Sequence, residues 1–157
     1  MNWPDGDTAS GGLGQPVAGV ACNATSQVYH VHTHVSIFLN GEQLAVPASI
    51  GIVDTATVHC DYHIHTHNKT GIIHVEAPAA DVFTLGQLFA IWGEPLSYTN
   101  VADLTGLPVT VYVTDNGVVT EYTGANLGDI ELISHREVTI QIGTPITEIP
   151  NYTWAGS

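Results

Sequence analysis

The chain has 157 residues, which is enough for one domain with a short extension and excludes a multidomain machine. Lys and Arg together number 2, against 15 Asp and Glu, so the formal net charge is −13. So few cations cannot neutralise a run of phosphates, which excludes nucleic acid and an anionic membrane surface as partners. Hydrophobic residues make up 44% of the chain and charged residues 11%, so the composition is not that of a disordered protein.

The first predicted strand covers residues 28–39 and follows a Gly/Ser-rich arm, residues 1–27, that has no hydrophobic periodicity. Alternation with a period of two places three histidines on one face of this strand. The Asn40-Gly41 pair that follows is typical of a tight hairpin turn. Residues 42–46 form the predicted return strand.

A second hairpin is predicted from a strand at residues 61–67, a turn at 68–71 and a return strand at 72–77. Residues directly opposite each other in such a hairpin have Cβ atoms within about 5 Å, so the register decides which side chains meet. If residues 67 and 72 flank the turn, two pairs of metal-binding residue types face each other: His65 with His74, and His63 with Glu76.

One helix is predicted at residues 84–92. Thr84 and Gln87 have the spacing of a capping box, in which each side chain binds a backbone N–H at the start of the helix. Apolar residues inside the segment follow at helical spacing, which is typical of a helix packed on a core. Gly93 and Pro95 end it.

The C-terminal part contains a third predicted hairpin, with strands at residues 109–114 and 118–122, and a last strand at 138–142. We therefore predict a mainly β protein, whose antiparallel hairpins form a sheet or small sandwich packed against one short α-helix. The His-rich β domain spans residues 28–143, and residues 144–157 form an extended tail.

The histidines are the main functional signal, because eight of the nine lie between His30 and His74. Two HxHxH strands each present three imidazoles on one face, about 6.5–7 Å apart along the strand. An HxH pair with a histidine across an antiparallel ladder can form a three-imidazole site, such as that of carbonic anhydrases, and we expect His63, His65 and His74 to share one ion. The predicted metal ligands are His30, His32, His34, His63, His65, His67 and His74. The candidates for a fourth ligand or an outer position are Glu76, His59 and His135.

The type of ligand limits which metal can bind. Met occurs once, at position 1, which excludes a thioether-rich copper(I) site and a blue-copper site with an axial Met. Imidazole with an occasional carboxylate suits Cu(II), Zn(II) and Ni(II), and we expect Cu(II) or Zn(II). Seven imidazoles exceed the needs of one ion, so more than one site is possible.

The two cysteines, Cys22 and Cys60, indicate the compartment. A disulfide between them would stabilise the fold by roughly 3–4 kcal/mol through loop closure, while two buried thiols or Cys60 as a metal ligand are the alternatives. We predict the disulfide and an extracellular, periplasmic or cell-surface location, because the cysteine pair, low Lys content and acidic charge favour an oxidising compartment. No apolar stretch reaches the ~20 residues that a membrane span needs, so we expect no membrane insertion.

Four motifs stand out along the chain: YHVHTHVSIFLNG (residues 29–41), CDYHIHTH (60–67), GIIHVE (71–76) and TLGQLFAIWG (84–93). Together they resemble those of a group of uncharacterised secreted proteins of bacteria and archaea. The resemblance covers roughly residues 20–143 and implies a secreted or anchored domain with this histidine layout, without implying a reaction. That group has an apolar residue where this chain has His63, which makes His63 the least secure ligand.

Three functions fit these observations. The first is an extracytoplasmic protein that binds copper or zinc for sequestration or delivery, and the absence of a nucleophile motif favours it. The second is a zinc enzyme of the hydratase or hydrolase type, which needs an open coordination position. The third is a surface or fibre subunit, a homo-oligomer in which metal crosslinks neighbouring copies.

Overall fold

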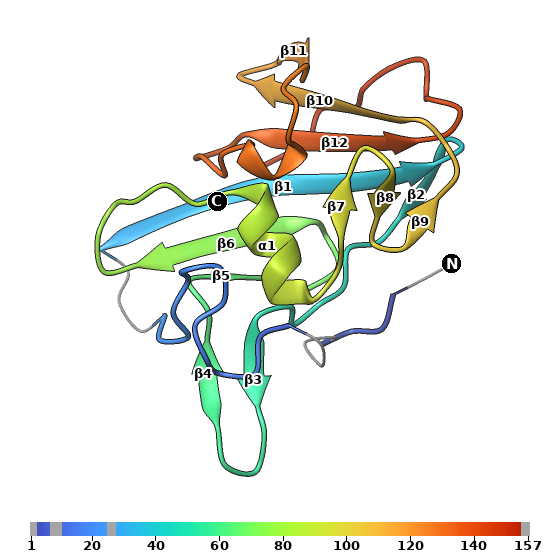
Figure 1. Cartoon of the computed structure of the whole chain (residues 1–157). Coiled ribbons are helices and arrows are strands. Elements are labelled where there is room, and N and C mark those ends of the chain that lie inside the picture. The colour runs from blue at the N-terminus through green and yellow to red at the C-terminus, as the bar shows by residue number, and fades with distance from the viewer. Residues whose placement is uncertain (1–2, 7–10, 25–27, 155–157) are drawn as a thin grey trace.

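The computed structural model describes residues 3–6, 11–24 and 28–154, so parts of the N-terminal arm (1–2, 7–10, 25–27) and of the tail (155–157) lie outside the described residues. The fold is mainly β with one short α-helix, as predicted (Figure 1). The elements in chain order are β1 (Tyr29–Leu39), β2 (Glu42–Leu44), β3 (Ile52–Asp54), β4 (His59–Asp61), β5 (Ile64–His65), β6 (Ile72–Ala77), α1 (Leu85–Trp92), β7 (Leu96–Ser97), β8 (Asn100–Val101), β9 (Leu104–Thr105), β10 (Val109–Asp115), β11 (Val118–Glu121), the 3₁₀ turn η1 (Leu127–Asp129) and β12 (Glu137–Ile142).

The main sheet has the strand order β11-β10-β12-β1-β6-β5, with β2 also paired to β1. The long strand β1 lies in the middle, antiparallel to β6 and β2 on one edge and parallel to β12 on the other. The β1–β12 pair departs from a purely hairpin-built sheet, since these strands come from opposite ends of the fold in sequence. The predicted hairpins β1–β2, β5–β6 and β10–β11 all form.

The core lies between the sheet and α1, which covers one face of the sheet in Figure 1. Val35 and Ile37 of β1 are at most 1% exposed on this face, as are Leu88 and Trp92 of α1. Burial of each such side chain contributes about 1.5–3 kcal/mol. The capping box is present as predicted, and the helix ends at Gly93, whose φ of 83° only glycine adopts without strain.

The strand predicted at residues 61–67 is interrupted. Only β5 pairs with β6, while β4 pairs with β3, which the sequence did not predict. The chain bends at Tyr62, whose N–H donates to the carbonyl of Gly51, and Tyr62 also forms a bridge with Cys22. Two backbone groups of the bend pair with the N-terminal arm, because the N–H of His63 donates to the carbonyl of Ala21 and the carbonyl of Asp61 accepts from the N–H of Ala24, while the carbonyl of His63 still accepts from the N–H of Glu76 in β6.

The Cys22–Cys60 disulfide is present, with 5.5 Å between the Cα atoms, which confirms the prediction and excludes Cys60 as a metal ligand. It fixes the arm next to β4. Trp3 adds an edge-on contact with Trp92 at 5.2 Å between ring centroids. Among the described residues no helix combines the length and the hydropathy that a membrane crossing requires.

Candidate metal centre

The histidines of β1 meet β6 through the antiparallel register between these two strands. His32 lies directly opposite His74, and His30 lies opposite Glu76. Directly opposed residues of an antiparallel pair share a face, and residues two apart on one strand share it too. The pairing therefore gathers three imidazoles and one carboxylate on one face of the sheet.

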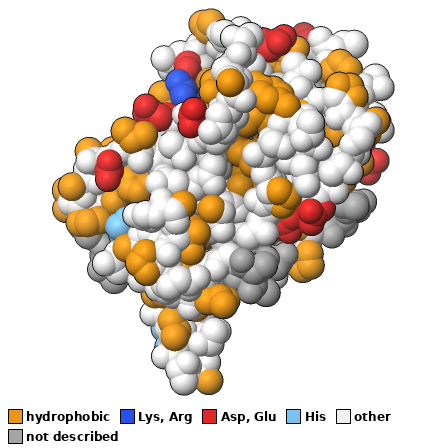
Figure 2. All heavy atoms as spheres, viewed as in Figure 1, with side chains coloured by type: hydrophobic (Ala, Val, Ile, Leu, Met, Phe, Trp, Pro, Cys, Tyr) orange, Lys and Arg blue, Asp and Glu red, His pale blue; other side chains and the backbone are white. Residues whose placement is uncertain are grey.

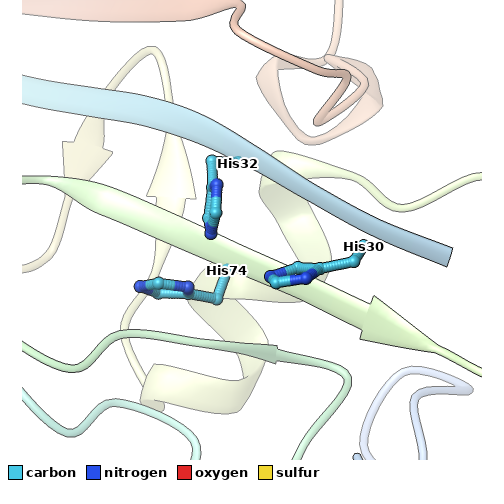
Figure 3. A group of neighbouring side chains, drawn as sticks. All are labelled: His30, His32 and His74. Carbon is cyan, nitrogen blue, oxygen red and sulfur yellow. The ribbon is translucent and has the colours of Figure 1, made fainter. Parts of the chain in front are cut away.

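Three of these side chains form a compact group, His30, His32 and His74, each offering a ring nitrogen (Figure 3). Their candidate ligand atoms all lie within 4.8 Å of one another. The ring centroids of His30 and His32 are 4.8 Å apart, and those of His32 and His74 are 4.6 Å apart. We call these three residues the His trio. Three imidazoles at this spacing can coordinate one transition-metal ion and leave a further position open.

The His trio lies on the face of the sheet opposite α1, which Figure 3 shows behind the strands. The helix side of the molecule accordingly displays few histidine atoms in Figure 2. His30 is exposed, and His32 and His74 are half-buried. The group is thus open to solvent on one side, and it is not enclosed in a deep chamber.

Burial and electrostatic repulsion favour the neutral form of His32 and His74, which is the form that binds metal. The pKa of His74 is lowered from 6.5 to about 3, mainly by burial and then by repulsion from the neighbouring histidines, His67 first. The pKa of His32 is also lowered, mainly by burial and then by His30. Neutral imidazoles keep a lone pair free for a metal ion near neutral pH.

Glu76 is the carboxylate next to the trio and is 8% exposed. Its Oε1 lies 3.2 Å from Nε2 of His30, and its Oε2 lies 3.1 Å from Nε2 of His65. A carboxylate beside a metal-binding histidine fixes the orientation of the ring and raises its basicity. Glu76 is therefore placed either to orient His30 or to bind an ion itself.

His65 and His67 continue the histidine face beyond β6. His65 lies opposite His74 in the β5–β6 pair, as the sequence predicted, and their rings stack at 5.5 Å between centroids. His67 is exposed, and its ring centroid is 4.9 Å from that of His65 and 4.5 Å from that of His74. The face thus carries five neighbouring imidazoles.

The sequence led us to expect His63 to share one ion with His65 and His74. In the structure His63 does not belong to the His trio and has other contacts. Its Nε2–H donates to Oδ1 of Asn23 at 2.5 Å, and its ring packs edge-on against Phe83. Burial, followed by the effect of His65, lowers the pKa of His63. The structure thus builds the three-imidazole group from β1 and β6, whereas the sequence-based prediction used the strands expected at residues 61–67 and 72–77.

His34 has contacts that tie it to the C-terminal tail. Its Nε2–H donates to the carbonyl of Thr70 at 2.7 Å, and its ring stacks on Tyr152 at 3.9 Å between centroids. Burial lowers its pKa. The tail residue Tyr152 also donates its backbone N–H to Glu137. Sequence reasoning did not identify this aromatic cover, because only the fold brings residue 152 back over β1.

The other two outer candidates besides Glu76 are His59 and His135, and each has its own contacts. His59 is exposed in β4 and its Nδ1–H donates to Asp54 at 2.6 Å. His135 stacks on Trp154 at 4.4 Å, and its backbone N–H donates to the carbonyl of His32 at 2.7 Å. Neither belongs to the three-residue group that the described residues form.

A cavity of about 550 Å³ lies away from these histidines, between β10–β11 and the segment that leads to β12. Asp115, Glu121, Asp129 and Arg136 line it. The guanidinium of Arg136 donates a bidentate pair of hydrogen bonds to the carboxylate of Asp115 there. The cavity therefore does not serve the His trio.

Comparisons of the chain with family models, with curated proteins and with solved structures found no match.

Proposed function

We propose that this chain is an extracytoplasmic transition-metal-binding protein, which holds Cu(II) or Zn(II) at the His trio for sequestration or delivery. The observation that carries the proposal is the convergence of three imidazole nitrogens within 4.8 Å of one another on one sheet face. Imidazole ligands suit both ions, and the near absence of Met argues against a thioether copper(I) site.

The electrostatics of the chain support cation binding. With a formal charge of −13 the molecule attracts cations to its surface, and Glu76 places a carboxylate at the site itself. The lowered pKa of His74 reduces competition from protons for its lone pair.

The disulfide and the openness of the site support the proposed setting. Disulfides persist in oxidising compartments, where a protein of this kind meets metal outside the cytoplasm. An ion at His30, which is exposed, has a short path to solvent and can be exchanged. Exchange of this kind suits a protein that stores or passes on an ion.

The test is metal analysis of the full chain purified without a metal-affinity column, followed by calorimetric titration of chelator-treated protein with Cu(II) and with Zn(II). We expect a dissociation constant of micromolar or tighter for one of the two ions. His74→Ala removes a ligand from the centre of the trio and should weaken binding by roughly tenfold or more.

His59→Ala is the matched control, because it removes one imidazole that lies outside the trio and contacts Asp54. It should leave the affinity unchanged. Protein that carries no metal and shows no micromolar affinity for either ion contradicts the proposal.

A zinc enzyme of the hydratase or hydrolase type is the second candidate, favoured by one observation. Three imidazoles leave an open coordination position, at which zinc lowers the pKa of a bound water to about 7. Hydration of carbon dioxide or ester cleavage that rises in proportion to bound zinc would support it. Zinc-loaded protein without either activity would leave the binding function alone.

A further inference from the structure

A second group of potential ligands adjoins the His trio across β6. Reading from β1 across β6 to β5, the register gives one row with three histidines, His32, His74 and His65. The neighbouring row begins with His30 and Glu76. One ion at the trio uses only part of this face, because His65 and His67 remain beside it.

The surroundings of His65 require a positive charge near its Nε2 atom. Nδ1 lies 2.7 Å from the carbonyl oxygen of Tyr62, and because a carbonyl only accepts, Nδ1 carries the hydrogen. The neutral ring then presents the Nε2 lone pair 3.1 Å from Oε2 of Glu76. Two lone-pair atoms at this separation repel each other unless a proton or a metal ion accompanies them.

The burial of His65 makes this arrangement costly without such a charge. The residue is 0% exposed, and its Nε2 has no hydrogen bond among the described residues. A buried polar atom that lacks a hydrogen bond destabilises a fold, because it has lost its hydration without compensation. The atom is buried and lies close to the carboxylate of Glu76 without forming a hydrogen bond to it, and these are the features of a ligand.

Glu76 is placed to connect two ions. One of its oxygens lies near His30 of the trio, and the other lies near His65. A carboxylate with each oxygen beside a different histidine has the arrangement of a bridging ligand, which holds two metal ions roughly 3.5–4 Å apart in known two-metal sites. His67 stands at the solvent side of His65 and is exposed, so rotation to another staggered rotamer costs little.

We infer that the protein binds a second divalent transition-metal ion through His65 and His67, with Glu76 bridging it to the ion at the His trio. The inference rests on the proposed function, since the first ion supplies one half of the bridge. It makes the histidine face a two-ion centre.

The experiment is a titration of the metal-free full chain with Cu(II), followed by elemental analysis after desalting and by electron paramagnetic resonance. We expect two copper ions per chain. The second equivalent should add a half-field signal or reduce the signal per copper, because bridged Cu(II) ions couple magnetically.

His67→Ala is the test variant, because the side chain is exposed and its loss does not open the core. It should reduce the stoichiometry from two ions to one and abolish the coupling. His63→Ala is the matched control from the same strand region, since the His63 ring is occupied by Asn23, and it should keep two coupled ions.

The outcomes separate the inference from the proposed function. One ion in the wild type, with His67→Ala unchanged, overturns the second site and leaves the trio intact, and a proton then accompanies His65. Two uncoupled ions that His67→Ala retains also overturn it, because the second ion then lies elsewhere. No copper at all removes both the proposed function and the inference.

Discussion

Acidification of the metal-free protein should reveal the burial of His74. Its pKa is about 3 in the folded protein, against 6.5 in the unfolded chain. Between pH 6.5 and pH 3 His74 binds a proton in the unfolded chain but stays neutral in the folded protein. The free energy of unfolding therefore falls as the pH drops from 6.5 toward 3. The stabilisation is complete above pH 6.5.

The magnitude follows from the size of the pKa change. Each unit corresponds to about 1.4 kcal/mol, so the whole window gives at most ~5 kcal/mol for His74. The ring is partly exposed, and water screens part of its unfavourable charge. We therefore expect His74 to lower the free energy of unfolding by roughly 2 kcal/mol between pH 7 and pH 4.

Urea denaturation of chelator-treated protein at pH 7, 5.5 and 4 measures this loss. Comparison with His74→Gln isolates the contribution of His74, because other histidines with a lowered pKa titrate in both proteins. The wild type should lose more stability than the variant on acidification. Parallel pH profiles for the two proteins would refute the reasoning, as would an NMR titration of the His74 ring with a midpoint near 6.5.

Three further predictions concern the bridge, the disulfide and a turn. Glu76→Gln keeps the shape of the side chain but removes its charge, and it should weaken metal binding, measured by calorimetry, about 10–100-fold. An unchanged affinity would show that Glu76 neither orients His30 nor bridges two ions. Reduction of the Cys22–Cys60 disulfide should lower the free energy of unfolding by about 4 kcal/mol in urea denaturation, and a Cys22→Ala/Cys60→Ala variant that matches the oxidised protein would contradict this. Gly71→Ala should lower the free energy of unfolding by more than about 1 kcal/mol in the same assay, because φ is +84° and the added Cβ would lie 2.5 Å from the carbonyl oxygen of Val35. Thr70→Ala at the neighbouring position is the control and should lower it by less.

The local part of the site could be predicted from the sequence, because turn residues and alternation act between neighbours in the chain. The turn before β6 sets the β5–β6 register, and His65 indeed lies opposite His74. The capping box at Thr84 likewise needs only residues within one turn of helix. These elements combine short-range signals that agree with the final fold.

The composition of the His trio could not be predicted in this way. It depends on β1 pairing with β6, and no turn or spacing in the sequence specifies which distant strand β1 joins. Alternation showed that His30 and His32 share a face, but several partner strands were compatible with it. The observed pairing replaces His63 and His65 of the expected three-imidazole group with His30 and His32.

Other elements could not be predicted because their strands are short or interrupted. The strands β7, β8 and β9 have two residues each, which is too short for alternation to be visible. The turn between β8 and β9 uses Ala102 and Asp103 at positive φ, without the glycine that usually marks such a turn. The bend between β4 and β5 depends on the arm and the disulfide, which act from far away in sequence.

The parallel pairing of β1 with β12 has a consequence for the order in which the molecule folds. The Thr33 hydroxyl on β1 donates to the carbonyl of Ile133, 100 residues further along the chain, whereas His34 reaches Thr70 over only 36 residues. Contacts between distant residues form late, because closing a long loop costs more conformational entropy. We expect β1 and β6 to pair first during folding. The histidine face then forms before the sheet is complete, and β12 pairs with β1 last.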